Sequence, residues 1–143
     1  MLANEPELID WTDFEAARQQ LGADFARILQ YFREDGAKSV DRIEAAMRDQ
    51  NTAALVVPAH TLKGESMQFG AYQLSELAET IELTARKFLE TRQSPEGLVP
   101  TVAALRGTFE RTLAQLEDAV NPLVKRRLTE DQPTFANQKF GRL

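Results

Sequence analysis

The sequence predicts an all-α protein, an antiparallel four-helix bundle with a short N-terminal capping helix. Apolar residues recur at spacings of three and four through most of the chain, and alternating β-branched runs are absent. Four long amphipathic segments are joined by short connections, which in helical proteins favours antiparallel neighbours. A composition with 43% hydrophobic and 27% charged residues supplies both a buried core and a charged surface.

A short helix and a long helix are expected first. Residues 12–15 read Thr-Asp-Phe-Glu, a capping box that predicts the start of the short helix, and residues 21–22, Leu-Gly, predict its end. An apolar stripe then predicts a long helix over about residues 23–50. Gly36 falls within this segment and allows a bend, but the stripe resumes after it, so we expect one helix.

Three further helices complete the predicted bundle. The third has its N-cap at residues 51–52, Asn-Thr, and closes at residues 69–70, Phe-Gly. Pro58 lies inside it, and because proline has no N–H it should remove one hydrogen bond and kink the helix. The fourth helix is expected over about residues 71–90, and the last begins somewhere in residues 95–101.

Composition and charge limit the possible functions. The chain has 143 residues and a net charge of −5. It contains no cysteine, which excludes disulfides and thiol chemistry. We expect one bundle domain over residues 1–120 and a basic C-terminal extension, partly helical or irregular, over residues 121–143. The extension carries a net charge of +3, which leaves −8 on the bundle and argues against nucleic-acid binding. No apolar run approaches the roughly 20 residues that span a membrane, and the N-terminus is acidic rather than signal-like, so we expect a cytoplasmic protein without a membrane partner.

The only histidine, His60, lies in the third predicted helix, in the run PAHTLKGES. With about 100° of rotation per residue, Leu55, Leu62 and Phe69 fall on the far side of that helix. The packed face is therefore opposite His60, and the imidazole should point to water. A lone histidine is usually structural, but this position argues against a core role.

Lys63 and Gly64 fall beside His60 on the helical wheel. A neutral imidazole is a nucleophile near pH 7, and Lys63, one turn on, supplies a cation that can pair with phosphate oxygens. A glycine inside a helix costs roughly 1 kcal/mol relative to alanine, and close approach by a partner would explain that cost on an exposed face. The alternatives are a solvated Lys63 and a Gly64 that permits a tight helix crossing.

The run AHTLKG at residues 59–64 resembles the signature of histidine-containing phosphotransfer (HPt) domains of two-component phosphorelays. The resemblance continues through residues 69–82, with FGA followed by Leu, Leu and Ile-Glu at the family's spacing, and it covers about residues 8–120. The sequence departs from the pattern at Glu65, where the family usually has a small residue, and in having Pro58 two residues before the histidine.

The resemblance implies a relay function. His60 would accept a phosphoryl group from an aspartyl phosphate on one response-regulator receiver domain and pass it to another receiver's aspartate. Lys63 would contact the phosphate, and Gly64 would let the receiver's active site close over the histidine. Glu82, at the edge of the fourth helix's apolar stripe, would accept the Nδ1 proton and orient the ring; the alternative is an ordinary surface glutamate. A hybrid histidine kinase is a further expected partner.

The expected partner-binding residues lie around His60 on the third helix: Val56, Val57, Thr61, Gly64, Met67 and Gln68. An exposed apolar patch around a polar centre is typical of transient interfaces. The competing interpretation is that the short first helix covers this patch.

Other classes of function fit less well. The sequence has no glycine-rich loop or Walker pattern, so we expect a phosphotransfer protein without kinase activity of its own. One histidine, no cysteine and no Glu-x-x-His motif argue against zinc and di-iron sites. We expect no cofactor of its own, with Mg²⁺ supplied by the receiver domain, and a monomeric chain. The main alternative is a non-catalytic adaptor of HPt shape that binds receiver domains without phosphotransfer.

Overall fold

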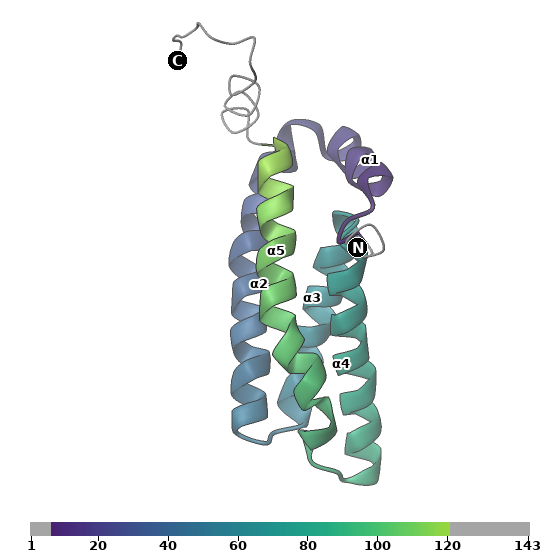
Figure 1. Ribbon diagram of the computed structural model, residues 1–143, viewed down its shortest axis with the longest axis vertical. Helices are drawn as coiled ribbons and strands as arrows, with labels where there is room; N and C mark the ends of the chain where they lie inside the picture. The colour runs from purple at the N-terminus through teal and green to yellow at the C-terminus, as the bar shows by residue number, and fades with distance from the viewer. Residues whose placement is uncertain (1–6, 121–143) are drawn as a thin grey trace, which may run out of the picture. The chain divides into compact units, whose positions relative to one another are not determined.

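The computed structural model describes residues 7–120. Its five α-helices are α1 (Trp11–Leu21), α2 (Phe25–Arg48), α3 (Val56–Gln68), α4 (Tyr72–Thr91) and α5 (Val99–Val120) (Figure 1). Short 3₁₀ turns precede three of them: η2 (Gly22–Asp24), η3 (Ala53–Leu55) and η4 (Pro95–Leu98). The described residues contain no strand, and α2, α3, α4 and the first part of α5 form the antiparallel bundle. The predicted fold class is therefore confirmed.

The chain divides into two units, and the boundary between them along the sequence lies inside α5, between Thr112 and Leu113. The first unit holds the bundle described below. Of the second unit, residues 113–120 are described; they continue α5, and Leu116 is buried. The predicted basic extension, residues 121–143, lies outside the described residues, and the expected domain boundary at residue 120 stays a prediction. No described helix combines the length and the apolar character needed to cross a membrane.

Helix α1 begins at an N-cap that the sequence pattern placed wrongly. The cap is Asp10, whose side chain accepts hydrogen bonds from the backbone N–H groups of Thr12 and Asp13. The predicted cap, Thr12, instead lies in the first turn. The helix ends as expected at Gly22, which has a positive φ of 54°. The capping-box pattern identified the helix correctly but set its start two residues late.

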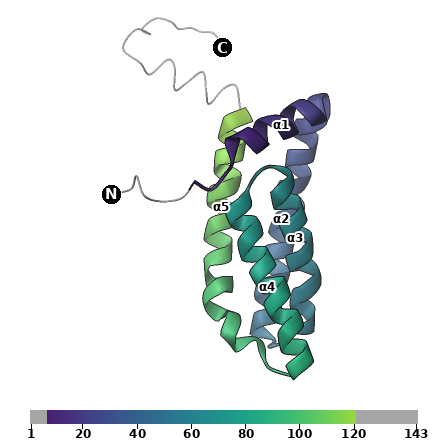
Figure 2. The ribbon, with the colours of Figure 1, turned by 90° about the vertical axis from the view of Figure 1, so that its right-hand side faces the viewer.

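A tight main-chain contact joins α1 to the turn between α3 and α4 (Figure 2). Asp10 N donates to Gly70 O at 2.8 Å. Gly70 has a positive φ of 75°, and a Cβ at this position would lie 2.7 Å from Asp10 O. Only glycine combines this backbone conformation with so close an approach.

The long helix α2 is continuous through Gly36, where it packs closely against α5 (Figure 1). A Cβ at Gly36 would lie 2.5 Å from Phe109 Cε1, so the glycine makes room for the aromatic ring. Further along, the Arg106 guanidinium binds Glu44 and Asp41, with Nη2 2.8 Å from Glu44 Oε1. An aromatic side chain and a cation from α5 thus fix its position against α2.

The prediction of a proline kink in α3 was wrong. The chain enters α3 through η3, where Ala54 N donates to Asn51 Oδ1 at 3.2 Å, so the expected Asn51 cap is present. The α-helix itself begins at Val56, which places Pro58 in the first turn. A first-turn N–H has no acceptor within the helix, so the missing N–H of Pro58 costs no helical hydrogen bond.

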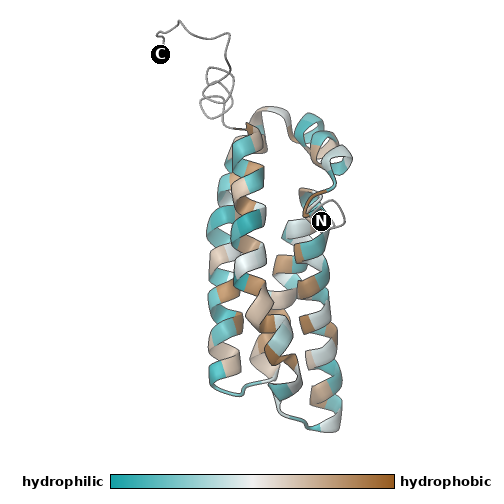
Figure 3. Cartoon of the chain, in the orientation of Figure 1, coloured by the Kyte–Doolittle hydropathy of each residue, from teal (hydrophilic) through white to brown (hydrophobic). Residues whose placement is uncertain are grey.

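A chain of aromatic rings leads from Trp11, which is 37% exposed, to buried phenylalanines in the core at one end of the bundle. The rings come from α1, α2, the end of α3 and α5, with neighbouring centroids 5.0 to 5.8 Å apart: Trp11, Phe14, Phe25, Phe69, Phe32 and Phe109. Along each helix, hydrophobic and hydrophilic segments alternate, as expected where one side of the helix is buried (Figure 3). The core holds α3 and α4 side by side, and the candidate site lies between these two helices.

Candidate functional site on helices α3 and α4

His60 projects from the solvent-facing side of α3. Its side chain is 61% exposed, whereas Leu55, Leu62 and Phe69 are fully buried. The predicted exposure of the imidazole is therefore confirmed. The apolar stripe of α3 fixes this orientation, because burying it turns the position of His60 outward.

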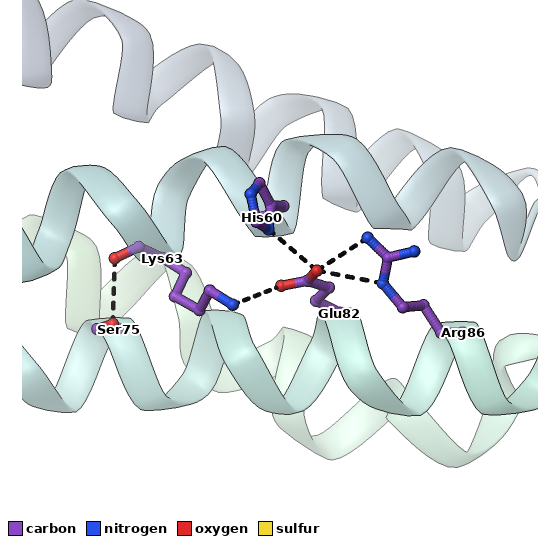
Figure 4. A network of polar contacts seen from close by, with 5 residues as sticks. All are labelled: His60, Lys63, Ser75, Glu82 and Arg86. Carbon is purple, nitrogen blue, oxygen red and sulfur yellow. Dashed lines mark hydrogen bonds and ion pairs between the residues drawn. The ribbon is translucent and has the colours of Figure 1, made fainter.

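Glu82 extends from α4 toward His60, and its Oε2 lies 3.0 Å from His60 Nδ1 (Figure 4). This distance fits a hydrogen bond in which Nδ1–H donates to the carboxylate, leaving Nε2 as the unprotonated ring nitrogen. The sequence placed Glu82 at the edge of an apolar stripe, but its side chain is only 5% exposed. The alternative of an ordinary surface glutamate is thus wrong, and the buried carboxylate needs partners.

Two cations bind the Glu82 carboxylate, one at each oxygen. Lys63 Nζ from α3 lies 3.0 Å from Oε1, and Arg86 from α4 donates to Oε2 through Nε at 3.2 Å and Nη2 at 3.0 Å. Burial alone raises the pKa of Glu82, but hydrogen bonds from Lys63, Arg86 and His60 outweigh it and lower the pKa to about 2. The carboxylate is consequently ionised throughout the neutral range.

Lys63 occupies a different environment from the one expected of a solvated lysine. Its side chain is 25% exposed and pairs with Glu82, and its backbone carbonyl accepts a hydrogen bond from Ser75 Oγ at 3.1 Å. Both contacts cross from α3 to α4, so they hold the two helices in register at the site (Figure 4). Contact between Lys63 and a phosphate stays a prediction.

Arg86 is the member of this network that the sequence reasoning missed. It stands four residues after Glu82 on α4, and acidic and basic residues at that spacing commonly pair on a helix surface. The pair Glu82/Arg86 was therefore visible in the sequence, but its importance depends on the burial of Glu82, which the sequence did not reveal.

Comparison with known proteins identifies the family. Residues 27–123, more than half of the chain, match the family model of the Hpt domain. The chain belongs to the Hpt family. Members of this family are phosphotransfer intermediates of two-component systems rather than kinases, and the chain is accordingly a histidine phosphotransfer protein. A search of curated proteins gave no significant match.

A solved structure has the same fold as this Hpt domain. It is histidine-containing phosphotransfer protein B (HptB) from Pseudomonas aeruginosa PAO1, with a TM-score of 0.62 and 22% sequence identity. The alignment covers 90% of this chain and 100% of that chain. At this level of identity the likeness supports the fold and assigns no role to individual residues.

The surface of the Hpt domain around His60 is open. Val57 is 68% exposed and Met67 58% exposed, so α1 does not cover the apolar patch. A Cβ added at Gly64 would meet no atom within 4 Å, which excludes a tight helix crossing as the reason for this glycine. Of the other predicted partner-binding residues, Thr61 and Gln68 are exposed and Val56 is half-buried. Their role in binding stays a prediction.

Glu65, the departure from the family pattern, lies to one side of this surface. It is half-buried, and its Oε1 is buried without a hydrogen-bond partner. Burial, and secondarily the charge of Asp35 on α2, raises the pKa of the Glu65 carboxyl. The carboxyl therefore lies toward α2 and not beside His60. Within residues 7–120, no group of three or more acidic, histidine or cysteine side chains is arranged to hold a metal ion.

Proposed function

We propose that this Hpt domain relays a phosphoryl group between aspartates of receiver domains through a phosphohistidine at His60. The observation that carries the proposal is the contact between His60 Nδ1 and the buried, ionised Glu82 carboxylate on an otherwise exposed imidazole. A proton held at Nδ1 leaves the Nε2 lone pair available for attack on phosphorus.

The transfer step balances without any further reactant. Nε2 of His60 forms the N–P bond as the P–O bond to the receiver's aspartate breaks, and the aspartate leaves as a carboxylate. The Nδ1 proton stays on the ring, which becomes positively charged, and Glu82 stabilises that charge. The reverse step, with a second receiver's aspartate as the nucleophile, completes the relay.

The remaining roles follow from the same proposal. Lys63 contacts the phosphoryl oxygens, and Gly64 leaves space for the receiver's active site to approach His60. The receiver domain brings the aspartate and the Mg²⁺ that polarises the phosphoryl group. A hybrid histidine kinase supplies the phosphoryl group through its receiver domain. The expected monomeric state and cytoplasmic location accompany this proposal as predictions.

Phosphotransfer from ³²P-labelled receiver domains tests the proposal. Wild-type protein should acquire an acid-labile, base-stable label, and His60→Gln should acquire none while its circular dichroism spectrum stays unchanged. A folded His60→Gln protein that takes up the label would disprove the assignment of His60. If the wild type binds receiver domains tightly but never accepts label, the chain is a non-catalytic adaptor of HPt shape.

A further inference from the structure

We propose that Arg86 is a positioning residue that keeps Glu82 paired when Lys63 leaves it to bind the phosphoryl group on His60. This inference rests on the proposed function. It concerns a residue outside the AHTLKG run, and it assigns different tasks to the two cations that share one carboxylate.

The need for a second cation follows from the burial of Glu82. Its side chain is 5% exposed, and Lys63 Nζ lies 3.0 Å from its Oε1. A lysine has one charged nitrogen, and pairing with phosphoryl oxygens draws it away from the carboxylate. Leaving a buried carboxylate without a cation is unfavourable, so a Lys63 that was the sole partner would be held back from the phosphate.

Arg86 removes this conflict through the geometry of its contacts. Both Nε and Nη2 donate to Oε2, the oxygen that also contacts His60 Nδ1, whereas Lys63 is bound at Oε1. Release of Lys63 therefore frees one oxygen and leaves the arrangement at the other intact. The planar guanidinium holds its two donors at fixed spacing, so Arg86 keeps the carboxylate in place against the imidazole.

Charge also favours this division of tasks. Before phosphorylation, Glu82 carries one negative charge and is paired with two positive side chains, so the cluster has a surplus of one positive charge. The phosphoryl group arrives with about two negative charges. The surplus cation is the one that can move to it, and Arg86 is the one that stays.

A double-mutant cycle on the phosphotransfer equilibrium tests the inference. The ratio of phosphohistidine to phosphoaspartate is measured with one receiver domain for the wild type, Arg86→Gln, Lys63→Gln and the double variant. Arg86→Gln should lower the equilibrium constant on the order of fivefold, because Lys63 still pairs with Glu82 in the unphosphorylated variant, whereas no cation remains beside Glu82 once Lys63 has moved to the phosphoryl group. In the Lys63→Gln background the same change should have less than about a twofold effect, because no lysine then moves.

Two further variants separate this role from general effects. Arg86→Lys keeps a cation near Glu82 and should recover part of the loss. Lys87→Gln removes an exposed positive charge from the next position of α4 and should leave the equilibrium unchanged. Equal effects of Arg86→Gln with and without Lys63, or no effect in either background, would overturn the inference. Absence of label on the wild type would instead count against the proposed function itself.

Discussion

One carboxylate, that of Glu82, connects the residues of the site. It contacts His60 and Lys63 on α3 and Arg86 on α4, although only 5% of its side chain is exposed. A histidine on a helix surface would otherwise be free to adopt either neutral tautomer. The buried acceptor selects the tautomer with the proton on Nδ1, and the two cations keep that acceptor charged.

The stability of the protein should depend on Glu82 in a pH-dependent way. Its pKa of about 2 in the folded protein lies below the ordinary value of 4.5. The ionised group therefore stabilises the fold above pH 4.5, and this contribution is lost as the pH falls toward 2. Glu82→Gln should lower the free energy of unfolding by about 1–3 kcal/mol at pH 7, and the difference should shrink near pH 2.

Urea denaturation at pH 7 and at low pH measures this effect. Glu79→Gln is the matched control, because Glu79 is an exposed glutamate on the same helix. It should unfold like the wild type at both pH values. A gap between the wild type and Glu82→Gln that is the same at both pH values would contradict the stabilising role of the ionised carboxylate.

The tautomer of His60 should also depend on Glu82. In Glu82→Ala the Nδ1 proton loses its acceptor, so the neutral ring should shift toward the form protonated at Nε2. Long-range ¹H–¹⁵N correlation spectra report the tautomer directly, and the single histidine of the chain makes the assignment unambiguous. Phosphotransfer should slow in the same variant. An unchanged tautomer would mean that Glu82 does not hold the proton.

At the scale of elements, a glycine lies inside each of two helices, α2 and α3, and the structure gives a different reason for each. Gly36 in α2 is buried against Phe109, and a Cβ there would lie 2.5 Å from the ring. Gly64 in α3 has no neighbour within 4 Å of a Cβ. The first glycine serves packing within the bundle, and the second leaves space on a surface that partners can approach.

Substitution of these two glycines should therefore have opposite effects on stability. Gly64→Ala should stabilise the protein by up to about 1 kcal/mol through helix propensity, whereas Gly36→Ala should destabilise it by about 1–3 kcal/mol through the clash with Phe109. Thermal unfolding measures both.

Gly64→Gln should fold well yet transfer phosphate more slowly, on the order of tenfold, because its bulk displaces the receiver. Normal transfer by Gly64→Gln would show that nothing approaches this glycine.

Sequence periodicity was sufficient to predict the longer helices, because each buries an apolar stripe, whereas α1 was predicted from the signals at its two ends. The same periodicity placed His60 opposite the stripe of α3 and hence in solvent. Periodicity did not predict the burial of Glu82. A helical wheel shows which face of its own helix a residue lies on, but it does not show which side chains of a neighbouring helix cover that residue. The predicted kink at Pro58 failed for a related reason: a difference of a few residues in where the α-helix begins decides whether a proline breaks a hydrogen bond.

At the scale of the whole molecule, the first unit is closed at one end by the contact between α1 and the α3–α4 turn. Gly70→Ala should weaken it, because alanine at a φ of 75° is strained and its Cβ would approach Asp10 O to 2.7 Å. We expect a loss of about 2–4 kcal/mol in the free energy of unfolding. Gly64→Ala is the control, because its backbone is helical and its Cβ would meet no atom within 4 Å, so it should lose no stability. Equal losses in the two variants would show that the close approach contributes nothing.

The main-chain character of this contact has a consequence for how the protein can change over evolution. The bond from Asp10 N to Gly70 O is made by main-chain atoms, so at residue 10 only the capping role of the side chain restricts the choice of residue. The exposed positions of α1 outside the aromatic chain, Thr12 and Glu15 among them, can therefore be replaced without displacing the helix. Substitutions that change the exposed surface of α1 should therefore leave the fold intact, provided that residue 70 remains glycine.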